Sequence, residues 1–271
     1  PHFIKDTTDR NRTSPFAFTG NKFEFRMPGS ALSVSEPNIV INTAVAEVLG
    51  EFADRLEGLS GKALEAEIHL LLKEVLRDHR HIVFNGNGYT SEWVEEAHKR
   101  GLFDLPSCAE AFPRLIAEKN VELFLKHGIY TKEEIQARFE IHVENYRNIL
   151  VIEATTMVDM IRHQILPAVS RYASDLCQRA ASKEGMGVPC KYETATAKEV
   201  GKLTDTLLSA CDKLEKDLEK VPAGSKKAMD YCHQAIIPDM AKAREAADQL
   251  ETLTDSKYWP FPVYSDLLFS V

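Results

Sequence analysis

The sequence predicts a mostly α-helical protein that has one short strand near its start and a bundle of long helices in its second half. The strand is indicated by residues 22–26, where charged and aromatic side chains alternate with a period of two. The bundle is indicated by long stretches after residue 131 in which apolar residues recur at helical spacing. Each element follows from local signals of this kind.

The first half predicts a series of helices after the strand. A helix should begin near Ser35 and continue to about Leu56, where Gly58 and Gly61 end it. A second helix should cover roughly residues 62–78. Two further segments complete this half, a short helix from residue 90 or 91 to Lys99 and a stretch from Ser107 to Lys126 that Pro113 interrupts.

The second half opens with a capping box at residues 131–134, with Glu134 at the third helical position. It starts a helical stretch that extends to about residue 183, and Pro167 should kink or break this stretch. Residues 184–189 then read as a loop.

Two more long helices are predicted, over about 195–220 and 225–253, with a short link between them. Such a pair forms an antiparallel hairpin. The aromatic segment 258–264 contains two prolines and should not be helical, and we expect it to dock on an apolar surface.

Composition narrows the class of protein. The chain has 271 residues and a net charge of −8, without a basic stripe, so nucleic acid is not an expected partner. It has neither an apolar run long enough to cross a membrane nor a signal-peptide pattern, so no membrane partner is expected. Five widely spaced cysteines without a CxxC pair favour reduced thiols in a cytoplasmic protein over a zinc site. The start at Pro1, without Met, predicts a piece of a larger polypeptide.

The strand at residues 22–26 is the candidate functional site. Lys22, Glu24 and Arg26 lie on one face of it, about 7 Å apart, and phenylalanines occupy the other. A carboxylate between two cations suits a site that holds a metal ion together with anionic oxygens, and Arg12 upstream could add a phosphate-binding fork. The alternative is an ordinary edge strand whose charges face water.

The segment NRTSPFAFTGNKFEFRMPGS, residues 11–30, resembles the C-terminal catalytic segment of glutamine synthetases, in the form of the type III bacterial class. Later segments are similar as well, including residues 105–146, IEATTMVDMIRHQILPA and WPFPVYSDLLF. The resemblance implies that residues 1–150 are the C-terminal part of an α+β catalytic domain. It also implies that residues 151–271 are the helical extension of the type III class.

The resemblance also implies an activity and the residues that carry it. Glutamine synthetases form glutamine from glutamate, ammonium and ATP through a γ-glutamyl phosphate, with Mg²⁺ or Mn²⁺. Glu24 matches a metal ligand and Arg26 the arginine that holds substrate glutamate. Arg12 matches the arginine that stabilises the transferring phosphoryl group, and Lys22 lies where other classes have an arginine near the nucleotide. Ala17 departs from the pattern, because other classes have another arginine there.

The family's N-terminal domain and its other metal-binding glutamates are absent from the sequence. We therefore expect this chain to be inactive alone and to work in a ring-shaped, dodecamer-like homo-oligomer. The alternative from another class is a non-catalytic helical module for oligomerisation or regulation. Two further patterns could be ligand sites but favour simpler interpretations. His79 with His81 favours a polar helix end over a metal-ligand pair, and the Asn-Gly repeat at 85–88 favours a plain turn over an anion-binding nest.

Overall fold

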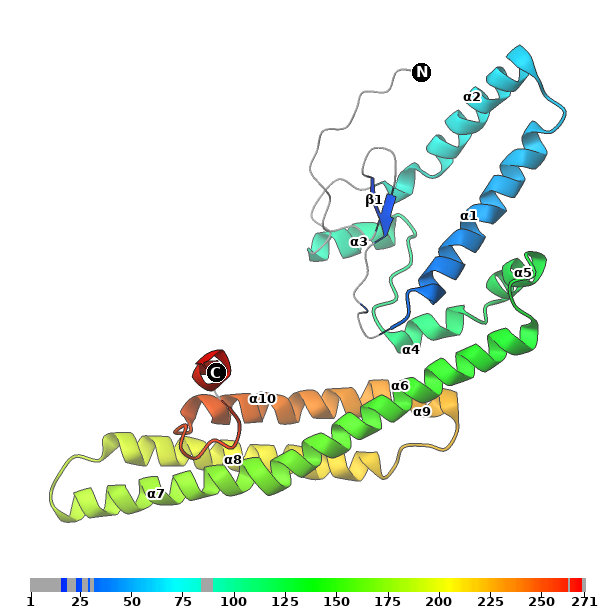
Figure 1. Cartoon of the computed structure of the whole chain (residues 1–271). Helices are drawn as coiled ribbons and strands as arrows, with labels where there is room; N and C mark the ends of the chain where they lie inside the picture. The colour runs from blue at the N-terminus through cyan, green and yellow to red at the C-terminus, as the bar shows by residue number, and fades with distance from the viewer. Residues whose placement is uncertain are drawn as a thin grey trace. The chain divides into compact units, whose positions relative to one another are not determined.

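The computed structural model describes residues 16–18, 23–25, 29, 32–83, 90–262 and 264–269. The chain divides into two compact units, Pro1–Lys132 and Glu133–Val271. Both are mainly helical, as predicted (Figure 1). The predicted domain boundary near residue 150 falls inside a long helix of the second unit, and it stays a prediction about the family.

Unit 1 contains a two-stranded antiparallel hairpin of β1 (Phe16–Phe18) and β2 (Phe23–Phe25). β2 lies within the strand expected at 22–26, and the two end residues of that stretch lie outside the described residues. The register pairs Ala17 with Glu24 and sets each outer phenylalanine of β1 opposite one of β2. The local alternation gave no sign of β1, because its pairing is a tertiary contact.

Two helices of unit 1 have the predicted bounds, α1 at Ser35–Leu56 and α2 at Gly61–Asp78. Between them Gly58 has a φ of +76°, a left-handed conformation that glycine adopts without strain. Arg55 of α1 forms ion pairs with Glu67 and Glu74 of α2, each at 2.6 Å from a guanidinium nitrogen to a carboxylate oxygen. A short 3₁₀ turn η1 (Arg80–Ile82) follows α2.

The rest of unit 1 consists of short helices. Ser107 and Glu110 form a capping box, in which each side chain bonds to the backbone N–H of the other residue. Pro113 lies in a 3₁₀ turn between two helices, so it interrupts the stretch as predicted. The elements are α3 (Ser91–Lys99), α4 (Cys108–Ala111), η2 (Phe112–Arg114) and α5 (Glu118–Lys126).

Unit 2 opens with α6 (Lys132–Met160), a π-helical turn η3 (Ile161–Ile165) and α7 (Leu166–Gly185). Pro167 lies in the first turn of α7, and it neither ends the helical stretch nor leaves a gap in it. Proline has no N–H and its ring clashes with the carbonyl four residues earlier, and a wider turn just before it removes both problems. The predicted kink or break is therefore a π-turn.

The next helix, α8 (Lys191–Leu218), begins about four residues earlier than predicted. Glu193 in its first turn is buried and pairs with Lys183 near the end of α7. This ion pair joins the two helix ends across the intervening loop, and it is a tertiary contact that sequence spacing does not reveal. It explains why the helix extends toward the loop.

The chain returns through α9 (Ser225–Tyr231), a second π-turn η4 (Cys232–Ile236) and α10 (Ile237–Leu253). Pro238 lies in the first turn of α10, so this π-turn precedes a proline as the first one does. The sequence pattern over 225–253 predicts one continuous helix here and gives no sign of the π-turn. A short helix α11 (Tyr264–Phe269) follows near the end of the chain.

The core of unit 2 lies between α7, α8 and α10, which run side by side (Figure 1). Leu203 and Leu207, one helical turn apart, form a buried face of α8 in this core. It packs with side chains of the π-turn, α7 and α10, namely Ile161, Ile165, Val169, Tyr172, Leu176, Ala243, Ala246 and Leu250. The helical hairpin predicted for this region is confirmed.

The aromatic segment after α10 docks on this core, as predicted. Trp259 is 8% exposed and belongs to the same apolar cluster. The ring centroid of Tyr258 lies 5.3 Å from that of Tyr172, and Phe261 packs edge-on against Trp259. The segment is not helical up to residue 262, whereas Tyr264 already begins α11.

Candidate functional site

Most of the predicted site residues lie outside the described residues, namely Arg12, Lys22 and Arg26. Glu24 is the central residue of β2, so its backbone is placed and its side chain is not. The assigned roles of these four residues therefore stay predictions.

The hairpin register nevertheless adds one relationship to the predicted site. Ala17 of β1 is the pairing partner of Glu24 of β2. Residues directly opposite each other in an antiparallel ladder belong to the same face of the sheet. The position that departs from the pattern of other synthetase classes thus stands next to the predicted metal ligand.

A complete metal site is not present in the described part of the chain. Among those residues there is no group of three or more His, Cys, Asp or Glu side chains that could hold an ion. His79 and His81 have ring centroids 6.3 Å apart at the end of α2, and Nδ1 of His81 lies 3.1 Å from the carbonyl oxygen of Asp78. This arrangement is a polar helix end.

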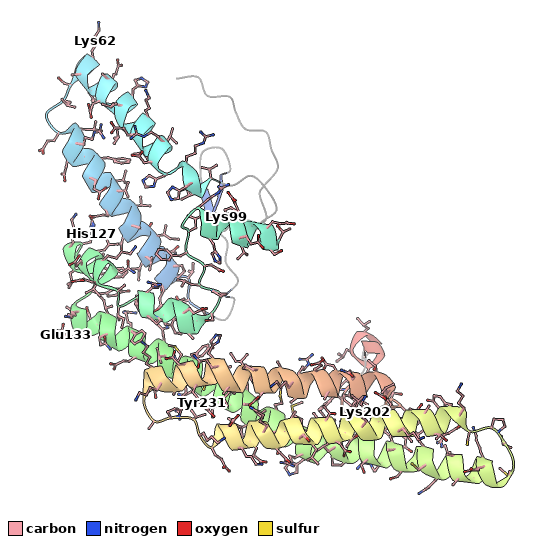
Figure 2. All side chains as sticks on the ribbon, turned by 180° about the vertical axis from the view of Figure 1, so that it is seen from behind. Lys62, Lys99, His127, Glu133, Lys202 and Tyr231 are labelled. Carbon is pink, nitrogen blue, oxygen red and sulfur yellow. The ribbon has the colours of Figure 1, made fainter. Side chains whose placement is uncertain are left out.

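The charge clusters of unit 1 join helices. His127 follows α5 and is labelled in Figure 2, and its Nε2 lies 2.7 Å from Oε2 of Glu47 on α1. Lys126 donates to the other carboxylate oxygen of Glu47 at 2.6 Å. These contacts, that with Lys126 above all, lower the pKa of Glu47. The cluster fixes α5 against α1 and has no free group for chemistry.

The strongest charge network of unit 2 is also structural. Lys213 of α8 contacts Asp217 on the same helix and the buried Asp239 of α10. Lys220 bonds to the second oxygen of Asp217 at 2.8 Å. Hydrogen bonds from Lys213 and Lys220 hold the pKa of Asp217 well below its ordinary value. The carboxylate oxygens are occupied by ammonium groups, so this network joins α8 to α10.

Several large apolar side chains of unit 1 are exposed. Thr43 is the one buried residue of the 22-residue helix α1, within the part of the chain that the structure describes. Val45 and Leu49 of α1 are 50% and 59% exposed, and Leu76 of α2 is 69% exposed. Val45 and Leu49 are one helical turn apart, so they belong to the same exposed face of α1.

Unit 2 contains an apolar groove between α6–η3 and α10. Its volume is about 500 Å³, and Trp259 and Phe261 form one end of its wall. Charged side chains of both helices stand at its edge. The groove has none of the predicted site residues.

Comparison with known proteins identifies the class. Residues 67–184 match the family model described as the glutamine synthetase C-terminal domain. The chain is 38% identical over 275 residues to a glutamine synthetase of Butyrivibrio fibrisolvens. The aligned region covers 99% of this chain and 39% of that relative. Residues 67–184 thus correspond to a glutamine synthetase C-terminal domain, and the chain as a whole is similar to a C-terminal portion of these synthetases.

Two further relatives narrow the class. The chain is 35% identical over 279 residues to a type-3 glutamine synthetase of Dictyostelium discoideum, covering 99% of this chain and 38% of the relative. It is 32% identical over 281 residues to a glutamine synthetase of Bacteroides fragilis (strain YCH46), covering 100% and 38%. The resemblance to the type III class is confirmed, and the chain spans less than two fifths of the length of these relatives.

Proposed function

We propose that this chain forms the C-terminal part of an ATP-dependent glutamate–ammonia ligase, a glutamine synthetase of the type III class. The observation that carries the proposal is the similarity to glutamine synthetases along the whole chain, at 38% identity to one of them. The motif at residues 11–26 supports it, because this segment has the residue types of the family's catalytic strand.

Within such an enzyme the chain's own residues would bind and orient charge. The guanidinium of Arg26 suits a carboxylate of substrate glutamate, since its planar fork donates two parallel hydrogen bonds. Arg12 would stabilise the negative charge that develops on the transferring phosphoryl group. Lys22 would contact the nucleotide as a point charge, and Glu24 would bind a metal ion.

The remaining metal ligands would come from outside this sequence. Mg²⁺ or Mn²⁺ and ATP are the expected cofactor and co-substrate, and the cation supplies charge neutralisation for phosphoryl transfer. Glu24 is one carboxylate, and no group of three candidate ligands occurs in the described ranges. The chain alone should therefore be inactive.

The exposed apolar side chains of unit 1 favour the interpretation that this unit is only part of a domain. A helix of 22 residues gains most of its stability from burying an apolar face, and none of the apolar side chains of α1 is fully buried here. The relatives have more than half of their length outside the matched region. We infer that this additional chain covers Val45, Leu49 and Leu76 in the complete enzyme.

The other partners follow from the same assignment. Glutamate, ammonium and ATP are the proposed substrates, and a ring-type homo-oligomer in the cytoplasm is the proposed form of the enzyme. No helix in the described part of the chain is long and apolar enough to cross a membrane. The helical unit 2, with its closed charge networks, would serve packing and assembly.

The test is the substitution Glu24→Ala in the complete synthetase, with Glu65→Ala on α2 as the matched control. Glutamine formation from glutamate, ammonium and ATP is measured with Mg²⁺ and with Mn²⁺. We expect activity to fall at least about 100-fold in Glu24→Ala, and to stay unchanged in the control, while both variants fold. Activity retained in Glu24→Ala would exclude the metal role. Glutamine formation by the 271-residue chain alone would show that the site is complete here.

A further inference from the structure

The apolar groove of unit 2 has the features of a ligand site. It is lined on the α6–η3 side by Met157, Met160, Ile161 and Ile165 and on the α10 side by Ala243 and Ala247. Its floor is well packed, because Ile161, Ile165 and Ala243 are at most 5% exposed. It lies beside the π-turn η3, and π-turns within long helices frequently occur at functional sites. The two methionines provide a wall that adapts to the shape of a ligand.

A buried polar group in the wall of the groove lacks a partner. Trp259 is 8% exposed, and its indole Nε1–H is buried without a hydrogen-bond partner among the described residues. A buried N–H without an acceptor costs free energy, and native structures rarely leave one unsatisfied. Because this nitrogen is inaccessible as the ring stands, a ligand with a carbonyl oxygen would supply the missing acceptor after a small rotation of the indole toward the groove.

The edge of the groove is acidic. Glu153 on α6 and Glu251 on α10 are exposed there, and Asp248 accepts hydrogen bonds from Arg244 at 2.8 and 3.0 Å. The arginine is thus paired, and the two glutamates leave the edge negative. A positively charged group on the ligand would complement this edge.

The dimensions favour a small molecule over a protein. The groove has a volume of about 500 Å³, which is within the range of pockets for small ligands. A stable protein interface needs about 800 Å² of buried surface on each partner, in a broad and mainly flat patch. A recess between two helices with a single unsatisfied donor matches the first case.

We propose that this groove binds a small apolar molecule that carries an amide carbonyl and a positively charged amino group. The carbonyl accepts from Nε1–H of Trp259, the apolar body packs against Met157 and Ile161, and the amino group faces Glu153 and Glu251. The site belongs entirely to unit 2, and it is independent of the ligase activity proposed above.

Three ligands with the same hexyl body test the proposal on the 271-residue chain carrying Trp93→Phe, so that Trp259 is the one tryptophan left. N-hexylglycinamide is cationic, N-hexylacetamide is neutral and N-hexylmalonamate is anionic at pH 7. Binding is measured by tryptophan fluorescence and by calorimetry. We expect the cation to bind roughly three-fold tighter than the neutral amide, and the anion to bind most weakly. Equal binding of all three, or no saturable binding, would overturn the proposal.

Matched variants separate the parts of the site. Ala247→Leu fills the groove and should weaken all three ligands at least about ten-fold, whereas Ala241→Leu, exposed on the same helix and outside the groove, should change nothing. Circular dichroism checks that both fold. The double variant Glu153→Gln with Glu251→Gln should bind the cationic and neutral amides equally. A preference for the cation that persists there would refute the charge assignment.

Two further measurements test the hydrogen bond from Trp259 and the alternative that a second copy of the chain occupies the groove. Trp259→Phe keeps an aromatic ring and removes the N–H, and calorimetry should show several-fold weaker binding of N-hexylacetamide. Unchanged affinity would contradict the hydrogen bond. Sedimentation of the same samples detects a second copy in the groove, since a dimer that Ala247→Leu dissociates would overturn the small-molecule proposal.

Discussion

Lys213 of α8 donates hydrogen bonds to both carboxylate oxygens of Asp239 on α10, at Nζ–O distances of 2.7 and 2.5 Å. Asp239 is 2% exposed, whereas the side chain of Lys213 is about half exposed. The pair therefore joins two helices through a carboxylate that depends on one cation. Asp239 directly follows Pro238, just after the second π-turn. Removing the ion pair therefore tests how much it stabilises this part of the fold.

Lys213→Met should lower the free energy of unfolding by about 2 kcal/mol, because it leaves a buried carboxylate without its cation. The loss should be smaller than for a fully buried pair, because solvent screens the exposed ammonium of Lys213. Urea unfolding followed by circular dichroism measures it. Lys216→Met, exposed on the same helix, is the control and should stay within about 0.5 kcal/mol of the unsubstituted chain. A similar loss in both variants would contradict the assignment.

Asp217 predicts a pH dependence of stability. Hydrogen bonds from Lys213 and Lys220 lower its pKa in the folded chain, and the ordinary value in an unfolded chain is about 3.9. A lowered folded pKa stabilises the fold above the unfolded value, and this contribution is lost as the pH falls toward the folded value. Asp217→Asn should therefore be less stable at pH 7, and its difference from the unsubstituted chain should shrink below about pH 4.

Urea midpoints at pH 7, 5 and 3 measure this difference. Asp205→Asn, exposed on the same helix, should match the unsubstituted chain at all three values. A deficit for Asp217→Asn that stays the same from pH 7 to pH 3 would show that the carboxylate's charge is not its source.

Trp259 should be a major stabilising residue of unit 2. Trp259→Ala removes a buried indole from the core cluster, and we expect a loss of about 3 kcal/mol in the free energy of unfolding. Thermal melts monitored at 222 nm report it. Leu267 of α11 is 65% exposed, so the control Leu267→Ala should leave the melt unchanged. If both variants melt alike, the aromatic segment is not docked on the core.

The exposed face of α1 predicts a difference between the chain and the complete synthetase. Leu49 is 59% exposed here, so Leu49→Gln should cost less than about 0.5 kcal/mol in the 271-residue chain. In the complete enzyme it should cost about 2 kcal/mol, because the contact proposed above would bury this side chain against the additional chain. Denaturant titrations of both proteins make the comparison, with Glu51→Gln as the control. Equal small costs in both would mean that Leu49 faces solvent in the enzyme as well.

Much of the helical pattern was predictable because its signals are local. Ser35, Gly58 and the apolar spacing between them are enough to bound α1, and Pro113 interrupts its helix as a missing N–H requires. The start of α8 was not predictable in this way, because it depends on the pair between Lys183 and Glu193. The π-turn before Pro167 was predicted only as a kink or break, since the sequence does not show which of several backbone distortions a proline produces.

The candidate site was likewise predictable only in part from the sequence. The alternation at residues 22–26 predicts a strand, and the resemblance assigns Glu24 its role. The pairing of Glu24 with Ala17 could not be predicted, because it joins two strands through a turn whose register depends on the folded hairpin. The groove beside Trp259 gave no sign in the sequence either, since its lining comes from three segments that are up to about a hundred residues apart.

The sequence by itself therefore determined the family, the helix-rich class and most helix ends, because composition, caps and periodicity act within a few residues of each other. Only the tertiary structure decided which of these faces are covered. It showed that Leu207 and Trp259 are buried while Leu49 is exposed, although all three count as apolar positions in the sequence. The physical reason is that burial depends on which surfaces the folded chain brings together, and this is a property of the whole chain.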